Sequence, residues 1–234
     1  MTSITNSIAF VTGANRGIGA ALVDALLAAG AARVYAAART PIAHADPRVV
    51  PITLDVTDAA AIAAAADRAG DVTLLINNAG ALEGGDIFTA GSDALERQLA
   101  VNALAPLRLT AALAPALRRS RGAVVTILSV VALAPMPGLA SYSASKAAAA
   151  SLTGSLRAAL AADGVSVHAV YPGPVDTDMA AGIDLPKTSP ADVARDILAG
   201  VESGDAEIFP DAFSRQIAAG WYADPHAVAA QFAA

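Results

Sequence analysis

Short apolar segments alternate with longer alanine-rich segments along most of this chain, and this alternation constrains the fold more than any other feature. The apolar segments have the length of buried strands and lie at residues 7–11, 33–37, 49–54, 72–76, 123–128, 165–171 and 207–209. The longer segments favour helices at residues 17–29, 57–69, 94–119, 141–162 and 190–201. Apolar strands separated by helices indicate a parallel sheet with helices on both faces. No linker, charge block or repeat divides the chain, so we predict one doubly wound α/β domain over residues 1–234.

The composition excludes several classes of function. The 234 residues include no cysteine, which excludes a disulfide framework, a thiolate zinc site and a cysteine nucleophile. The 15 Lys and Arg against 21 Asp and Glu give a net charge of −6, which argues against nucleic acid or an anionic membrane as a partner. The 3 histidines are not at metal-ligand spacing, so we expect no metal. The start of the chain lacks a signal-peptide pattern, and the longest charge-free stretch, residues 122–145, is interrupted by prolines, so we expect a cytoplasmic protein without a membrane span.

The first predicted strand ends in a glycine-rich turn, TGANRGIG at residues 12–19. Gly13, Gly17 and Gly19 let the backbone turn sharply and come close to a ligand. The helix that follows directs its unpaired N–H groups and its positive dipole end at the same place. The spacing differs from the usual Gly-x-Gly-x-x-Gly pattern, and the glycines alone are equally consistent with a simple strand-to-helix turn. Their position between a strand and a helix favours a pyrophosphate site.

Residues after the second and third strands indicate which dinucleotide would bind. Enzymes that bind NAD place an acidic residue at the end of the second strand, about 20 residues beyond the glycines, to hold the ribose hydroxyls. This chain has Arg39 there and Arg16 in the turn, and two guanidinium groups can hold a 2′-phosphate. The pair favours NADP(H), although an isolated surface arginine is more often simply solvated. Asp55, after the third strand, has two equal interpretations, as an acceptor for the adenine amino group or as a cap of the next helix.

A tyrosine and a lysine lie four residues apart in a predicted helix. This spacing places Tyr142 and Lys146 on one helix face, where the cation lowers the pKa of the phenol and makes it a general acid or base. The pattern alone is weak, because most such pairs are exposed decoration. Ser129 ends the preceding strand and can donate to a substrate oxygen, or it can be an ordinary turn serine. Asn102 lies inside a predicted helix, where its amide could hold a water that relays protons to Lys146.

These motifs, taken in order, resemble the classical short-chain dehydrogenase/reductase family over about residues 7–180. The matching features are the glycine turn, Asp55, Asn77-Asn78-Ala79-Gly80, Asn102, Ser129, Tyr142-x-x-x-Lys146 and Pro172-Gly173. The resemblance implies a Rossmann-type domain with a sheet of about seven strands and a preference for NADP(H). It also implies a catalytic tetrad. In this tetrad Tyr142 is the general acid/base, Ser129 orients the substrate oxygen, Lys146 binds the nicotinamide ribose, and Asn102 holds the relay water.

The resemblance also places residues along the cofactor. Asn78 and Ala79 are expected near the adenine ribose, and the segment after residue 171 is expected at the nicotinamide through the Val175 backbone and the Thr177 hydroxyl. The complete set of expected cofactor-binding residues is Gly13, Asn15, Arg16, Gly17, Ile18, Gly19, Arg39, Asp55, Val56, Asn78, Ala79, Gly80, Tyr142, Lys146, Pro172, Gly173, Val175 and Thr177.

The predicted function is the NADP(H)-dependent interconversion of a carbonyl and an alcohol. The apolar loop at 130–139 and a short substrate lid at about 178–189 favour an apolar ketone or aldehyde. Residues 205–234 diverge from the usual family tail, so the expected homo-oligomer could be a dimer or a tetramer. The alternatives are an NADP(H)-sensing regulatory protein with little turnover and a purely structural α/β domain, which leaves the polar groups at the strand ends unexplained.

Overall fold

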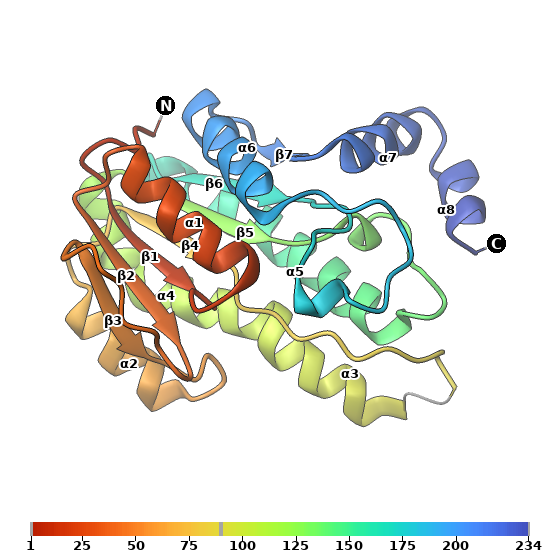
Figure 1. The fold of residues 1–234 in the computed structure, drawn as a ribbon, viewed down its shortest axis with the longest axis horizontal. Helices are drawn as coiled ribbons and strands as arrows, with labels where there is room; N and C mark the ends of the chain where they lie inside the picture. The colour runs from red at the N-terminus through yellow and green to blue at the C-terminus, as the bar shows by residue number, and fades with distance from the viewer. Residues whose placement is uncertain (1, 89–90, 234) are drawn as a thin grey trace.

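A seven-stranded parallel sheet forms the centre of the protein, which confirms the predicted doubly wound fold (Figure 1). The computed structural model describes residues 2–88 and 91–233. The strands lie in the order β3-β2-β1-β4-β5-β6-β7. Their bounds are β1 Ile8–Thr12, β2 Arg33–Ala38, β3 Val49–Thr53, β4 Leu74–Asn77, β5 Ala123–Ile127, β6 Ser166–Val170 and β7 Glu207–Ile208. The strand order reverses direction between β1 and β4, and in open sheets of this kind ligands bind beyond the carboxyl ends at such a point.

Two layers of helices cover the sheet. The main helices are α1 Gly17–Ala28, α2 Ala59–Arg68, α3 Gly91–Leu99, α4 Ala105–Ser120, α5 Ala140–Leu160 and α6 Pro190–Ser203. Helices α1 and α6 pack on one face, and α2, α4 and α5 pack on the other. Strand β1 contributes side chains to both clusters, because side chains alternate between the two faces of the sheet along a strand. Ala9 and Val11 join the first cluster, while Phe10 joins the second.

The helix predicted at residues 94–119 is interrupted. A π-helical segment, η1 Ala100–Leu104, separates α3 from α4. The interruption lies just before Pro106, which has no N–H group to bond the carbonyl of Asn102 in the regular α-helical pattern. By length and composition alone, residues 91–120 could cross a membrane. In the structure α4 instead contributes to the hydrophobic core beside the sheet, as the core helix of a globular protein does.

The C-terminal segment, which the sequence did not place, forms two helices. These are α7 Ala212–Ala223 and α8 Pro225–Ala233, and they lie at the opposite end of the molecule from β3 (Figure 1). Their apolar residues pack against α5, the end of β6 and the 3-10 turn η2 Val130–Ala132. The two helices approach closely, since a Cβ added to Gly220 would lie 2.9 Å from Val228. The tail therefore closes the side of the molecule that carries the predicted catalytic residues.

Candidate active site

A large cavity of about 1250 Å³ opens at the carboxyl edge of the sheet. It collects residues that follow six different strands, as the topology predicts. The expected site residues that line it are Gly13, Asn15, Arg16, Gly17, Ile18, Arg39, Asp55, Val56, Asn78, Ala79, Gly80, Ser129, Tyr142, Lys146, Pro172, Gly173, Val175 and Thr177. Two expected residues, Gly19 and Asn102, do not line the cavity and instead support its walls.

The glycine turn has the geometry of a phosphate cradle. Gly13 and Gly17 have φ angles of +64° and +55°, a region that residues with a side chain rarely adopt. A Cβ on Gly19 would lie 2.1 Å from the carbonyl oxygen of Gly13, so only glycine lets α1 start this close to β1. Arg16 precedes α1 and provides no side-chain cap for its first N–H groups. The exposed helix N-terminus therefore fits the pyrophosphate of a dinucleotide.

Asn78 fastens the end of β4 to this turn. Its Nδ2 donates to the carbonyl oxygens of Thr12 at 2.9 Å and Gly13 at 3.3 Å. In return, the Thr12 hydroxyl accepts from the backbone N–H groups of Asn78 and Ala79, at 3.0 and 2.9 Å. The Asn78 side chain thus shapes the cavity floor, and any contact of this residue with a cofactor stays a prediction.

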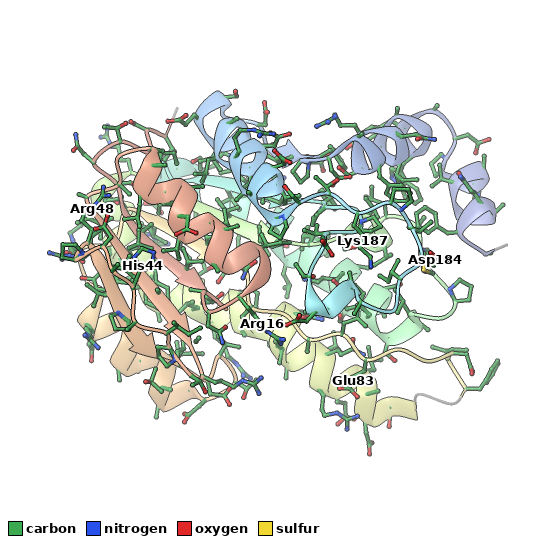
Figure 2. All side chains as sticks on the ribbon, viewed as in Figure 1. Arg16, His44, Arg48, Glu83, Asp184 and Lys187 are labelled. Carbon is green, nitrogen blue, oxygen red and sulfur yellow. The ribbon has the colours of Figure 1, made fainter. Side chains whose placement is uncertain are left out.

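The two arginines of the predicted adenosine end have different surroundings. Arg39 is exposed after β2 and makes no ion pair within the described ranges 2–88 and 91–233. The Arg16 side chain, labelled in Figure 2, extends from the glycine turn and donates from Nη1 to Asp178 Oδ2 at 3.1 Å. Asp178 begins the predicted lid, so Arg16 already has a carboxylate partner across the cavity mouth. Thr177 packs on the same turn, 3.1 Å from where a Cβ of Gly17 would lie.

Of the two interpretations of Asp55, the structure excludes the role of helix cap. The cap of α2 is Asp58, whose side chain accepts from the N–H groups of Ala60 and Ala61. Asp55 accepts instead from Thr57, at 2.9 Å from its N–H group and 2.7 Å from its hydroxyl, and these bonds lower the pKa of Asp55. Asp55 therefore remains an ionised group at the cavity wall, where it can accept a hydrogen bond from a ligand.

Tyr142, Lys146 and Ser129 converge on one part of the cavity. Helix α5 presents Tyr142 and Lys146 on the same face, and their exposed fractions are 8% and 3%. The Lys146 Nζ atom donates to the carbonyl oxygen of Ile127 at 2.7 Å and lies 5.7 Å from the centre of the Tyr142 ring. The side chain of Ser129 lies near enough to the phenol to lower its pKa. These three groups have the arrangement expected for proton transfer to a carbonyl oxygen.

Burial controls the ionisation of this pair. It raises the pKa of Tyr142 above its usual value, and the side chain of Ser129 opposes the rise to a smaller extent. Burial also lowers the pKa of Lys146 to about 8. The sequence predicted that the pKa of Tyr142 lies below its usual value, and this prediction is wrong. Removal of the phenol from water raises the pKa by more than the neighbouring groups lower it.

Asn102 is a structural link between two walls of the cavity. Its Nδ2 donates to Ala81 O and to Ser145 Oγ, both at 2.8 Å, and its Oδ1 accepts from Ala81 N at 2.9 Å. Ser145 donates in turn to the carbonyl oxygen of Tyr142 at 2.8 Å. The amide thus ties the segment after β4 to α5. Its predicted role of holding a relay water stays a prediction.

Sequence reasoning missed the part of the cavity that the tail provides. Phe213 of α7 and Phe232 of α8 line the cavity together with Met136 and Leu139. The tail also contributes Asp211, which caps α7 and is 2% exposed. An Asp three residues before a Ser at the start of a helical pattern is a recognisable capping signal, so the helix start could have been found. The contact between the tail and the cavity could not be predicted, because the two parts of the chain come together only in the folded protein.

The fold and the cavity at the carboxyl edge of its sheet are those of a dinucleotide-binding α/β protein. The sequence profile described as short chain dehydrogenase matches residues 7–187. A solved short chain dehydrogenase from Burkholderia cenocepacia, in complex with NADP, is 40% identical, covers 99% of both chains and superposes with a TM-score of 0.94.

Curated relatives point to the same family. A 3-oxoacyl-(acyl-carrier-protein) reductase of Salmonella typhimurium is 33% identical over 187 residues, 76% of this chain and 77% of its own. A protein of Xanthobacter autotrophicus named inactive 2-(S)-hydroxypropyl-CoM dehydrogenase 2 is 44% identical over 131 residues, but the match spans only 53% of this chain and 57% of the relative. The chain belongs to the short chain dehydrogenase family, and is thus an oxidoreductase of that family.

Proposed function

We propose that the protein is an NADP(H)-dependent reductase or dehydrogenase that interconverts an apolar ketone or aldehyde with its alcohol. The observation that carries the proposal is that one cavity contains both the glycine cradle and the buried group of Tyr142, Ser129 and Lys146. The cofactor assignment is supported by Arg16 and Arg39 at the cavity wall and by the NADP complex of the similar Burkholderia protein.

The chain's own residues orient the reactants and move the proton. The bound cofactor would supply or accept the hydride, as nicotinamides do. Tyr142 remains protonated at neutral pH because burial raises its pKa, so it is ready to donate to a carbonyl oxygen. The Ser129 hydroxyl donates to the same oxygen as negative charge develops on it. Lys146 is a cation below about pH 8 and stabilises negative charge on the phenol oxygen after proton transfer.

An apolar substrate fits this cavity. The cavity that contains Tyr142 is also lined by the apolar side chains of Met136, Leu139, Met179, Ile183, Leu185, Phe213 and Phe232. The charged side chains of Glu83 and Arg97, which also line the cavity, neutralise one another through two hydrogen bonds of 3.0 and 2.7 Å. A substrate charge beside this neutralised pair would gain little from it, whereas an aliphatic or aromatic ketone would bury its surface against methionine, leucine and phenylalanine side chains.

Replacing Tyr142 by phenylalanine tests the proposal. We expect Tyr142→Phe to lower kcat for reduction of an aromatic ketone such as acetophenone by at least 100-fold, on the order of general acid catalysis. NADPH binding, followed by its fluorescence, should change little. The matched control is Tyr222→Phe, which removes a hydroxyl from an exposed tyrosine of α7 that bonds Glu207 away from the cavity.

The same experiment separates the enzyme from the sensor. NADPH binding without turnover of any ketone or aldehyde in a panel, in the wild type as in Tyr142→Phe, would favour a cofactor-sensing protein. Turnover that survives in Tyr142→Phe would contradict the assigned role of the phenol.

A further inference from the structure

One peptide group connects the C-terminal tail to the catalytic wall. The Pro172 carbonyl and the Gly173 N–H belong to the same peptide plane, and both are held. The carbonyl oxygen accepts from the N–H of Val130, next to Ser129, at 3.1 Å. The N–H donates to Asp211 Oδ2 at 2.9 Å. A peptide plane bonded at both ends by different parts of the chain has a fixed orientation.

Asp211 has the properties of an anchor. It is 2% exposed, and its other carboxylate oxygen accepts from the N–H of Ser214 at 2.7 Å. Its own N–H donates to the Ser214 hydroxyl at 3.2 Å, which completes a capping box at the start of α7. A buried carboxyl group whose two oxygens each accept an N–H bond from a different part of the chain has a fixed orientation. Asp211 therefore transmits the position of α7 to Gly173.

The packing around Gly173 leaves no room for a side chain. A Cβ added there would lie 2.7 Å from Cδ1 of Phe213 and 2.9 Å from Oδ1 of Asp211. The tail thus lies directly against the cavity segment, and Phe213 reaches the cavity through this contact. Pro172 and Pro174 flank the glycine and carry no N–H, so Asp211 holds the single backbone donor of residues 172–174.

We propose that Asp211 is a positioning residue of the active site, which fixes the Pro172–Gly173 peptide and thereby the wall that faces the nicotinamide end of the cavity. This inference rests on the proposed function for its kinetic consequence, but the contact itself can be tested without turnover. It assigns a role to the divergent tail, which lies outside the residues 7–187 that match the family profile.

Hydrogen exchange tests the contact directly. Gly173 supplies the only exchangeable backbone amide in residues 172–174, so the exchange rate of its own amide signal, followed by NMR, reports on this contact. In Asp211→Asn, the single remaining carbonyl oxygen cannot accept from both Gly173 and Ser214, and we expect exchange at Gly173 to become at least about ten-fold faster. The matched control, Ser214→Ala, weakens the capping box but leaves the Gly173 bond to Asp211 in place, so Gly173 should stay protected.

Kinetic measurements distinguish a positioning role of Asp211 from a loss of overall protein stability. We expect Asp211→Asn to lower kcat for ketone reduction by about 10- to 100-fold, as misplacement of a reacting group by about 1 Å does. The isotope effect with 4-deuterated NADPH should rise, and the Kd for NADPH should stay within about three-fold. Ser214→Ala should leave the isotope effect unchanged even where the two variants lose similar thermal stability.

Gly173→Ala provides a second test if Asp211→Asn does not fold. Its Cβ would press against Phe213 and Asp211 Oδ1 and so displace the same peptide from the tail while the Asp211 carboxylate is retained. We therefore expect the same fall in kcat and the same rise in the isotope effect. Equal behaviour of Asp211→Asn and Ser214→Ala in exchange and kinetics would overturn the inference and leave the proposed function standing. Failure of the wild type to reduce any carbonyl would refute the proposed function, whereas the exchange result would still decide the contact.

Discussion

The two arginines at the cavity wall should contribute unequally to the preference for NADPH. A hydrogen bond to a charged group contributes about 1.5–3 kcal/mol, and the lower value applies to exposed side chains. Loss of about 1.5 kcal/mol corresponds to about a 12-fold rise in Kd. Arg39 has no ion-pair partner among the residues that the structure describes, so Arg39→Ala should weaken NADPH by about this factor and leave NADH unchanged.

Arg16 should contribute less to the binding free energy of NADPH, because its ion pair with Asp178 must break before it can bind the phosphate. That ion pair joins side chains that are 64% and 80% exposed, and such pairs contribute only about 0.2–1 kcal/mol. Subtracting this cost leaves about 0.5–1.3 kcal/mol, so Arg16→Ala should raise the Kd for NADPH by about 2- to 9-fold. Asp178→Asn removes the competing carboxylate and should tighten NADPH binding by about 1.4- to 5-fold without affecting NADH.

Fluorescence titration of each variant with NADPH and NADH, at one fixed ionic strength, measures these constants. Arg68→Ala, which removes a surface arginine at the end of α2, is the control for net charge. The reasoning is refuted if Arg16→Ala weakens NADPH as much as Arg39→Ala does. It is also refuted if Asp178→Asn weakens both cofactors equally, because the ion pair would then act as a strap that retains any dinucleotide.

Three further predictions concern the glycine turn, the buried His168 and the charge of Lys146. Gly19→Ala should weaken NADPH binding more than ten-fold in titration, since its Cβ would lie 2.1 Å from Gly13 O, whereas Gly182→Ala, with nothing within 4 Å, should not. His168 is buried, which lowers its pKa, so the unfolded state binds more protons. The free energy of unfolding should therefore fall as pH drops below about 6.5, and urea titrations should show a smaller fall in His168→Asn. Ketone reduction should decline above about pH 8 as Lys146 loses its proton, and a pH profile of Lys146→Met should lack that inflection.

The parts of the fold and site that the sequence predicted depend on local chemistry. The glycine turn requires positive φ angles at Gly13 and Gly17, and only a small set of residues meets that requirement. The four-residue spacing of Tyr142 and Lys146 places both on one helix face wherever the helix lies. The parallel sheet with helices on both faces followed from the same logic, because apolar strands separated by helices favour that architecture.

The parts that were missed depend on contacts between residues far apart in the chain. Arg16 meets Asp178 over a separation of 162 residues, and Gly173 meets Asp211 over 38. No propensity or spacing encodes such pairs. The π-helical segment before Pro106 interrupts the helix predicted at residues 94–119, and proline forbids one hydrogen bond but does not specify how the helix rearranges around it.

The pKa of Tyr142 shows why spacing alone misjudged the chemistry. An ammonium near a phenol favours tyrosinate, but the same burial that brings the two side chains together penalises both charged forms. In the protein alone the result is a neutral phenol beside a lysine that remains charged only below about pH 8. A protonated Tyr142 is suited to donate a proton to a carbonyl oxygen, whereas oxidation of an alcohol requires tyrosinate. As the proposed general acid, Tyr142 with its raised pKa favours reduction near neutral pH, and oxidation should need a higher pH.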